Sequence, residues 1–414
     1  MKICIKLSCL YYLFFLNIIV ANPSSYDSSF SNNGSTTNLY IASTVNQAQD
    51  IIAQPDGKIV TVGSAGENGI IVRYNNDGST DLTFNSLKTP GYIDIQLGTQ
   101  TALFSVILEP TNGKIIAVGY ATIAGVYNTF IARYNRNGTI DTTFNGTGYI
   151  LSLFQTQSQL YGVALQTNGS IVVAGWATEN GLSQALVARY TNNGVLDTTF
   201  NGIGYVTTLI GGVFTKAQDL VIQADGKIVI TGQAQVDGNQ GLIVIRYNTD
   251  GSLDETFNST GDNPGSISPL QDFVTSQGNS LTMQLNGKVV IVGYINADDF
   301  TTANRSYTVL RLNSDGTVDD TFNGIGYVIN EQALQAQGVV MQLNGQIITC
   351  GFNYTTLYVP VIIRYNNDGT VDPTFNFTIN QNTANSLGNA VALQIDGKII
   401  MTGTIQVPYQ QSAQ

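Results

Sequence analysis

Short runs of apolar, mostly β-branched residues recur along the whole chain, and turns rich in Asn, Asp and Gly separate them. In one stretch the runs cover residues 204–208, 219–223, 227–231 and 242–247. Such enrichment, with Asx-Gly turns between runs, is typical of strands joined in hairpins. The runs are apolar at nearly every position, which indicates strands covered on both faces. No useful amphipathic helical period lies between them, so the pattern predicts an all-β protein.

The hairpin turn belongs to an internal repeat with a spacing of about 56 residues. The turn reads Gln-Pro-Asp-Gly-Lys at residues 54–58, and its glycine recurs as Gly57, Gly113, Gly169, Gly226, Gly287, Gly345 and Gly397. A second landmark is an arginine followed by Tyr or Leu at the end of an apolar run, at Arg73, Arg133, Arg189, Arg246, Arg311 and Arg364. A third is Asp-x-x-Phe, whose phenylalanines are Phe30, Phe84, Phe144, Phe200, Phe257, Phe322 and Phe375.

Four strand-like runs in each unit, repeated about seven times, predict a β-propeller of about seven four-stranded blades. One blade alone would be unstable, because each buries its faces against its neighbours. We therefore expect residues 22–414 to form a single propeller domain. A right-handed β-solenoid is the alternative, although solenoids usually have shorter coils and lack a tight hairpin in every repeat.

The ends of the chain bear on how such a ring would close. The last unit has no Arg-Tyr strand, and residues 27–30 supply the Asp-x-x-Phe piece that would follow that strand. Neither end contains an obvious outer strand. We therefore expect a last blade that is one strand short, with an edge open to pairing with another chain. The favoured explanation of the missing strand is that the sequence is a truncated form of a longer chain.

Two repeated motifs carry a family resemblance over nearly all of residues 26–404. The first is Val-Ala-Leu-Gln-x-(Asp/Asn)-Gly-(Lys/Ser)-Ile-Val-Val-Ala-Gly. The second is Ala-Arg-Tyr-Asn-x-(Asp/Asn)-Gly-x-x-Asp-x-Thr-Phe-Asn-Gly-x-Gly. With these motifs the chain resembles the delta-60 repeat family, a bacterial β-propeller family. The resemblance implies an exported bacterial propeller, and it brings no catalytic residues because the family has no well-established activity.

The N-terminus has the features of a signal peptide. Lys2 and Lys6 precede an apolar run over residues 7–20, and Ala21 offers a cleavage site before Asn22. Fourteen residues span roughly 21 Å as a helix, less than the roughly 30 Å core of a bilayer. We expect residues 1–21 to be a signal peptide, with an uncleaved anchor or a buried structural segment as alternatives. The protein would then be secreted, periplasmic or at the cell surface, with no further membrane span.

Composition removes several classes of function. The net charge is −11, which excludes nucleic acid as an expected partner because a phosphate backbone requires a basic patch. The chain has no histidine, so Ser-His-Asp triads and His-ligated metal sites are excluded. Cys350 is the one cysteine outside the N-terminal segment, and its apolar run indicates a buried, inert thiol.

The repeated Arg, Asp and Phe positions are predicted to be structural. A guanidinium can bridge a carboxylate at a blade junction, as we expect for Arg246 and Asp254. The phenylalanine of Asp-x-x-Phe would then be a wedge between blades. The residues assigned this role are Asp81, Phe84, Arg133, Asp141, Phe144, Arg189, Asp197, Phe200, Arg246, Asp254 and Phe257.

A loop of oxygen-bearing side chains before a glycine resembles part of a calcium site. The candidate ligands are Asn75, Asp77, Asp81, Asn248, Asp250, Asp254, Asn366, Asp368 and Asp372. The glutamate that would complete an EF-hand is absent, and two other copies of the loop have an amide in place of a carboxylate. We therefore favour Asx turns over calcium, and we expect no other cofactor.

Taken together, these features favour an exported, non-enzymatic propeller that binds a protein or a glycan at a rim or in the central channel. One alternative is a propeller glycosidase with two carboxylates. Acids outside the repeat pattern would supply them, and the candidates are Glu67, Glu109, Glu179, Asp237, Asp262, Asp272, Asp298, Asp299 and Glu331. Another alternative is a structural surface module. Tyr120, Trp176, Tyr294 and Phe352 stand at matching repeat positions, where they would either line a rim as exposed glycan-stacking rings or pack within the fold.

Overall fold

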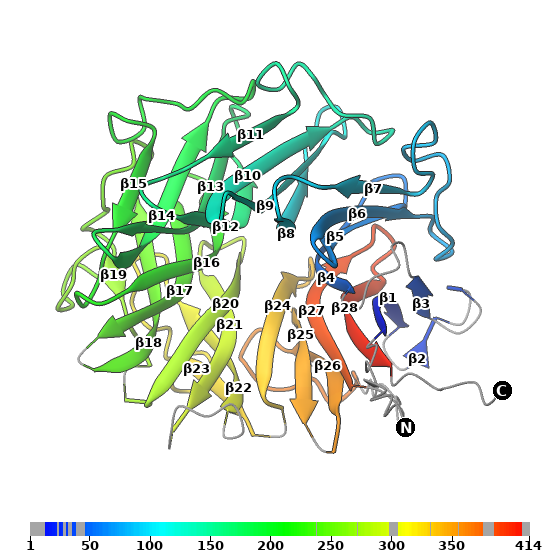
Figure 1. The fold of residues 1–414 in the computed structure, drawn as a ribbon. Coiled ribbons are helices and arrows are strands. Elements are labelled where there is room, and N and C mark those ends of the chain that lie inside the picture. Colours follow the sequence, from blue (N-terminus) through cyan, green and yellow to red (C-terminus); the bar gives the residue numbers. More distant parts are fainter. Residues whose placement is uncertain are drawn as a thin grey trace, which may run out of the picture.

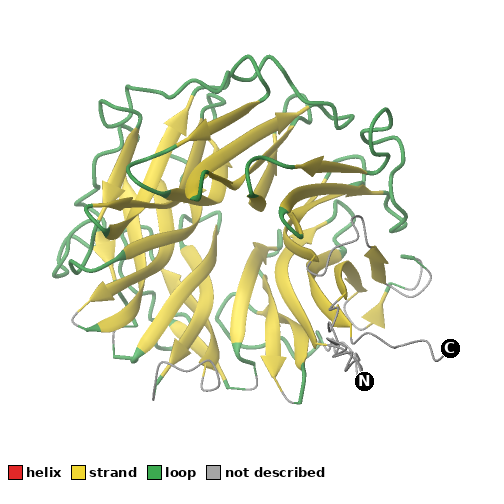
Figure 2. Cartoon of the chain, in the orientation of Figure 1, coloured by secondary structure: helices red, strands yellow, loops and turns green. Residues whose placement is uncertain are grey.

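The molecule is built from strands, turns and loops arranged in a ring (Figures 1 and 2). The computed structural model describes residues 13–22, 25–27, 30–31, 35–38, 46–236, 238–270, 272–297, 305–331, 333–354, 356–375 and 385–407. These residues contain no helix, so the prediction of an all-β fold is confirmed. Accordingly, none of them belongs to a helix long and apolar enough to cross a membrane. Sheets set radially around one axis define a β-propeller.

The described strands form six sheets, in which consecutive strands are usually neighbours. The first three sheets along the chain are four-stranded. They contain β4 (Asn46–Ala53), β5 (Ile59–Ala65), β6 (Asn68–Tyr74) and β7 (Tyr92–Ile95); β8 (Gln100–Leu108), β9 (Ile115–Ile123), β10 (Val126–Tyr134) and β11 (Tyr149–Ser152); and β12 (Ser158–Leu165), β13 (Ile171–Glu179), β14 (Leu182–Tyr190) and β15 (Tyr205–Thr208).

The next two sheets differ in size. The larger has eight strands: β16 (Thr215–Ile222), β17 (Ile228–Val236), β18 (Asn239–Tyr247), β19 (Ser266–Ile267), β20 (Thr275–Met283), β21 (Val289–Asn296), β22 (Arg305–Leu312) and β23 (Tyr327–Asn330). Its two halves, β16–β19 and β20–β23, are joined by one parallel pair, Gln240 with Thr275. The smaller contains β24 (Gln335–Met341), β25 (Ile347–Tyr354) and β26 (Tyr358–Tyr365).

The sixth sheet joins the two ends of the chain. It contains β27 (Asn385–Leu393), β28 (Ile399–Val407), β1 (Leu13–Asn22), β2 (Ser25–Tyr26) and β3 (Ser35–Asn38). β28 pairs with β27 on one side and with β1 on the other, from Leu13 opposite Val407 to Ala21 opposite Ile399. The expectation of a last blade one strand short is therefore wrong for this structure.

The N-terminal segment occupies the place of the missing Arg-Tyr strand. Val20 pairs with Ile400, as Arg73 pairs with Val60 in the β4–β7 sheet. The sequence interpretation missed this strand because a run that ends in β-branched residues suits both a strand and an export segment. Further along, Lys398 Nζ lies 2.7 Å from Asp27 Oδ2, so the Asp27 segment is bound to the last unit.

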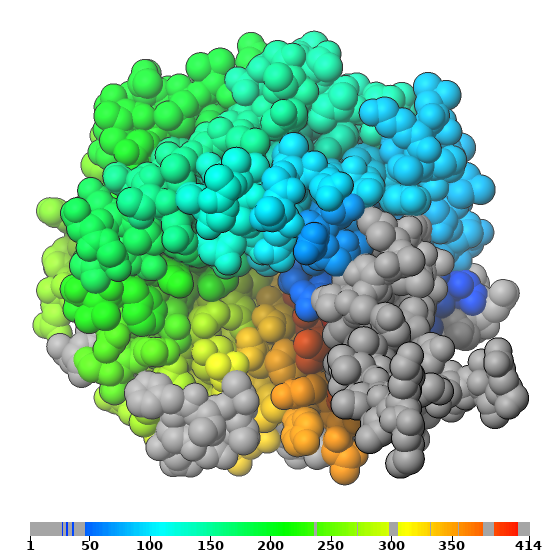
Figure 3. Space-filling model, viewed as in Figure 1, coloured from blue at the N-terminus to red at the C-terminus, as the bar shows by residue number. Residues whose placement is uncertain are grey.

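The sheets also correct the phase of the predicted repeat. Residues 204–208 come first among the four runs described above and would open a unit in that order, but β15 pairs with β14 as the outermost strand of the preceding sheet. Each chain segment therefore crosses from the outer edge of one sheet to the inner strand of the next. The units follow one another around the ring in chain order (Figure 3). The core lies between neighbouring sheets, as where Val187 of β14 and Ile230 of β17 belong to one buried cluster.

Candidate functional site in the central cavity

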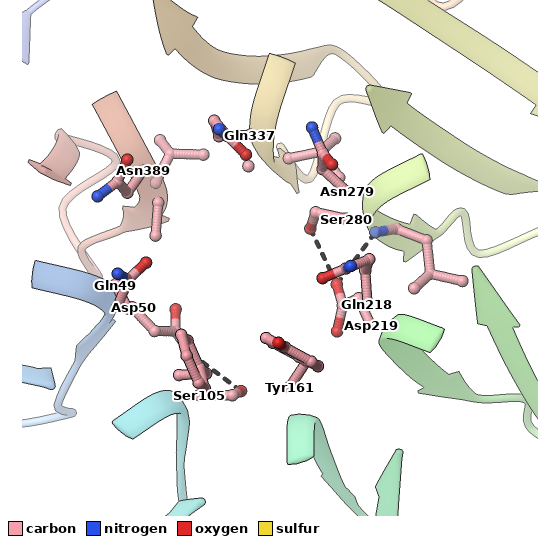
Figure 4. A pocket seen from close by; sticks show the side chains of 16 residues that line it. Gln49, Asp50, Ser105, Tyr161, Gln218, Asp219, Asn279, Ser280, Gln337 and Asn389 are labelled. Atoms are coloured by element: carbon pink, nitrogen blue, oxygen red, sulfur yellow. Dashed lines mark hydrogen bonds between the residues drawn. The ribbon is translucent and has the colours of Figure 1, made fainter. Parts of the chain in front are cut away.

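In each unit the strand nearest the axis is here called the inner strand; these strands are β4, β8, β12, β16, β20, β24 and β27. Every inner strand contains one β-bulge, and the residues at these bulges form the central site. The ladder skips one residue between Ala48 and Asp50 of β4, and the same irregularity recurs in the six other inner strands. The skipped residues are Gln49, Phe104, Tyr161, Gln218, Asn279, Gln337 and Asn389. A bulge re-aims the extra side chain. Six of the extra side chains are directed toward the axis in Figure 4, and Phe104 lines the same cavity.

A glycine in the second strand makes each bulge possible. Gly232 faces the bulge of β16, and a Cβ there would lie 1.9 Å from the Lys216 carbonyl oxygen. The same crowding occurs at Gly63, Gly119, Gly175, Gly293, Gly351 and Gly403. The repeat requires glycine at this position because no side chain fits against the bulged backbone.

The bulge residues surround a cavity of about 310 Å³ on the axis of the ring. Five of them are amides and two are aromatic, and all seven are half-buried. The Phe104 and Tyr161 rings are 4.6 Å apart between centroids and inclined at 41°. Arginine and lysine are absent from the residues that line the cavity. The site is therefore polar and carries no positive charge of its own.

Two carboxylates also line this cavity, from strands on different sides of it (Figure 4). Asp50 Oδ2 accepts hydrogen bonds from Ser105 Oγ at 3.1 Å and from the Val106 N–H at 2.9 Å, both in the next unit. Asp219 Oδ2 has the matching contacts with Ser280 Oγ at 2.9 Å and the Leu281 N–H at 3.1 Å. Each aspartate thus connects its inner strand to the following one.

The surroundings raise the pKa of both carboxyl groups toward neutral pH. Burial raises the pKa of Asp50 to about 6, and hydrogen bonds from Val106, Ile51 and Ser105 only partly oppose this rise. Burial likewise raises the pKa of Asp219 to about 7, and the charge of Asp50 adds to the rise. Perturbed carboxyl groups in a cavity are candidates for a functional site.

Asp219→Asn should flatten the pH dependence of stability. The folded protein keeps the Asp219 proton up to about pH 7, whereas the unfolded chain loses it near pH 3.8. The contribution of this proton to the free energy of unfolding is therefore fully present below pH 3.8 and is lost as the pH rises through 7. The loss is at most about 1.4 kcal/mol per pH unit. Urea unfolding between pH 4 and 8 measures the slope. An unchanged slope in the variant would contradict a raised pKa at this residue.

The predicted structural motif lies at the junctions between sheets, away from the cavity. Arg246 Nε lies 2.5 Å from Asp254 Oδ2, and the Arg246 guanidinium lies 4.6 Å above the Phe257 ring centroid. The expected contact between Arg246 and Asp254 is present and is made through Nε. Equivalent ion pairs join Arg73 to Asp81, Arg133 to Asp141, Arg189 to Asp197, Arg311 to Asp319 and Arg364 to Asp372. Phe84, Phe144 and Phe200 are fully buried under their own arginines.

The proposed calcium ligands are engaged in turns and ion pairs. Asp77 Oδ1 accepts hydrogen bonds from the Ser79 N–H at 2.9 Å and its hydroxyl at 2.6 Å, while Asp81 contacts Arg73 and Lys58 instead. Asn75, Asn248 and Asn366 each donate a hydrogen bond to the hydroxyl four residues later, and Asp250 and Asp368 accept from the Ser252 and Thr370 hydroxyls as Asp77 does from Ser79. Asp254 and Asp372 contact Arg246 and Arg364, with Gln346 in place of a lysine beside Asp372. Within the described ranges, no three acidic or sulfur side chains gather as a metal group would.

The other candidate residues lie outside the cavity. Tyr120, Trp176 and Tyr294 are 8%, 8% and 4% exposed inside strands, so they pack within the fold, and the alternative of exposed rings on a rim is wrong for these three. Glu109 is buried against Arg133, with 2.9 Å between Oε1 and Nη1. Asp237, Asp298 and Asp299 lie outside the described residues. None of Glu67, Glu179, Asp262, Asp272 and Glu331 lines the cavity. Cys350 is fully buried, and burial raises the pKa of its thiol.

Sequence reasoning missed the bulge residues together with Asp50 and Asp219. Two signals were available. Each aspartate lies four residues before the glutamine of the hairpin turn, inside an otherwise apolar run. The glycine opposite each bulge also recurs with the repeat, and an interior strand glycine marks a bulge or a close backbone approach.

The sheets and the polar axial cavity define the class as a β-propeller. The chain belongs to the family described as the beta-propeller domain of unknown function DUF5122, whose model matches residues 54–84, 111–144, 166–200, 223–257, 284–322 and 342–375. These matches cover about half of the chain. No curated protein matches it.

Several solved structures align with most of the chain at low sequence identity. A PL25 ulvan lyase aligns with a TM-score of 0.53 and 10% identity over 96% of each chain. The polysaccharide lyase Uly1 aligns with a TM-score of 0.47 and 9% identity over 94% of this chain and 99% of that one. The periplasmic gluconolactonase PpgL of Pseudomonas aeruginosa aligns at 0.44 and 11%, over 89% and 95%. At these identities the similarity concerns the fold alone.

Proposed function

We propose that this protein is a non-enzymatic binding module that holds a saccharide in its central cavity. The ring of five amide and two aromatic side chains carries the proposal. Amides both donate and accept hydrogen bonds, which suits the many hydroxyl groups of a sugar, and aromatic rings stack on its apolar faces. A cavity of about 310 Å³ lies at the small end of the range for small-molecule sites.

Two finer features of the fold belong to the same proposal. The inner strands β4, β8, β12, β16, β20, β24 and β27 line one cavity, which supports seven blades with two contributed by the eight-stranded sheet. The family match supports a repeat propeller, and the specific resemblance to delta-60 repeats rests on the motifs in the sequence.

Export is proposed from the N-terminal segment. Cleavage after Ala21 would remove nearly all of β1 and expose the backbone edge of β28. N-terminal sequencing of the protein recovered from expressing cells is expected to start at Asn22. A start at Met1 would contradict a cleaved signal peptide and would support β1 as a permanent strand.

Thermal unfolding with a saccharide panel tests the proposed function. A ligand at about a hundred times its dissociation constant should add roughly 2.7 kcal/mol of stability. Gln218→Ala and Gln337→Ala should each abolish the shift, because both amides line the cavity. Gln96→Ala, an exposed amide outside the cavity, should leave it unchanged. The same unfolding experiment with added calcium and with a chelator tests whether the turn loops bind calcium. No shift with any sugar would contradict the proposal and would favour a protein partner or a structural role.

An enzyme is the second candidate, because Asp50 and Asp219 have raised pKa values beside the cavity. Each carboxylate already accepts hydrogen bonds from the next unit, which supports a positioning role over a catalytic one. If a panel sugar is cleaved by the wild type and not by Asp219→Asn, the enzyme replaces the binding module.

A further inference from the structure

A second cavity lies at the ring end opposite the hairpin turns, between three consecutive units. Its volume is about 220 Å³. One wall is formed by Arg305 at the start of β22, Leu334 just before β24 and Gln335 at the start of β24. The other residues that line it are Phe352 of β25, Tyr358 of β26 and Leu387 of β27. It shares no residue with the central cavity.

The walls of this cavity are mainly apolar. Phe352 and Tyr358 meet edge to face, with centroids 5.5 Å apart and planes at 88°. Leu334 and Leu387 supply aliphatic surface. Such a lining favours an apolar body of small size.

Arg305 brings a positive charge to these walls. Its guanidinium carbon lies over the Tyr294 ring, 3.8 Å from the ring centroid, as in a cation–π contact. Nη1 donates a hydrogen bond to Gln335 Oε1 at 2.8 Å. The Nε–H is buried and has no hydrogen-bond partner.

The other seven arginines show what this one lacks. Each of them forms an ion pair with a carboxylate, as Arg136 does with Asp56 at 2.7 Å. Arg305 has no such partner among the described residues. Leaving a buried N–H donor unsatisfied is costly, and a carboxylate is the acceptor that an arginine edge binds best.

We propose that this cavity binds a carboxylate attached to a small apolar group, with the carboxylate on the Arg305 guanidinium and the apolar group against Phe352 and Tyr358. Two sources share this chemistry: a free aryl or alkyl acid, and the C-terminus of a peptide that ends in an apolar residue. The proposal is independent of the function assigned to the central cavity.

Isothermal titration calorimetry on the full chain tests it with phenylacetate and with the neutral phenylacetamide. Phenylacetate is expected to bind, and phenylacetamide at least tenfold more weakly, because only the acid pairs with Arg305. This comparison needs the wild type alone. A tetrapeptide ending in Phe, with a free or amidated C-terminus, distinguishes the peptide source from the free acid.

Variants locate the binding. Arg305→Gln should lower the affinity for phenylacetate at least tenfold. Arg136→Gln removes an exposed arginine elsewhere and should leave this affinity unchanged. Equal affinity for acid and amide, binding indifferent to Arg305→Gln, or no saturable binding of either acid would overturn the proposal.

Discussion

Replacing Phe257 with alanine is expected to lower the free energy of unfolding by about 3–5 kcal/mol. The side chain is fully buried and lies at a junction between two units. Arg246 covers one face of the ring, and the Gly316 loop of the next unit lies against it. A Cβ at Gly316 would come within 2.7 Å of the ring, so the loop is already in close contact. Alanine would leave a cavity there that rigid neighbours cannot fill.

The backbone beside Phe257 reinforces this junction. The Asn258 N–H donates to the Asp315 carbonyl oxygen at 2.7 Å, so the wedge and the loop hold each other in register. Urea unfolding measures the loss. Leu285→Ala, which truncates a side chain that is fully exposed, should cost under about 0.5 kcal/mol. A loss under about 1 kcal/mol at Phe257 would argue against a wedge role.

The sequence predicted these junctions because their residues recur. Arg246, Asp254 and Phe257 stand at fixed spacing in each unit, and only a contact made again at every junction requires such repetition. The ion pair and the ring under the arginine form within one Arg-Tyr strand and the turn after it, and the loop that covers the ring comes from the next unit. The contact between the Arg, Asp and Phe of each unit could therefore be predicted from the repeat alone.

The central cavity could not be predicted in the same way. Its lining residues vary from Gln49 to Phe104 to Asn389, because a side chain that faces an open space is not constrained by packing. Only the glycine opposite each bulge is constant, and it signals the bulge but not what the bulge presents. The carboxylates Asp50 and Asp219 come from different units and line one cavity only when the ring closes.

Strand Leu13–Asn22 shows a different limit. Its hydrophobicity and β-branched end satisfy both an export segment and a strand, and only pairing with Ile399–Val407 distinguishes them. That pairing joins the first and last parts of the chain. No local pattern contains this information.

Asp254→Asn is expected to destabilise the protein by about 3–5 kcal/mol, since it leaves two cations without their partner. Asp254 is 2% exposed and receives Arg246 Nε at 2.5 Å and Lys227 Nζ at 2.7 Å on one oxygen. Its other oxygen accepts from the Thr256 hydroxyl at 2.6 Å. An amide at this place carries no charge, and it would turn either an oxygen or an NH₂ group toward the arginine.

The acid side of the stability curve gives a second measure of this site. Burial alone would raise the pKa of Asp254, but hydrogen bonds from Lys227 and Thr256 and the charge of Arg246 hold it well below 3.8. The carboxylate therefore stabilises the fold above pH 3.8, and this contribution is lost as the pH falls through the lower folded pKa. Urea unfolding should show less acid destabilisation between pH 4 and 2 in Asp254→Asn than in the wild type. Asp250→Asn, at an exposed turn, is the matched control and should cost under about 0.5 kcal/mol. Equal losses in the two variants would show that the Arg246 pair does not stabilise the junction.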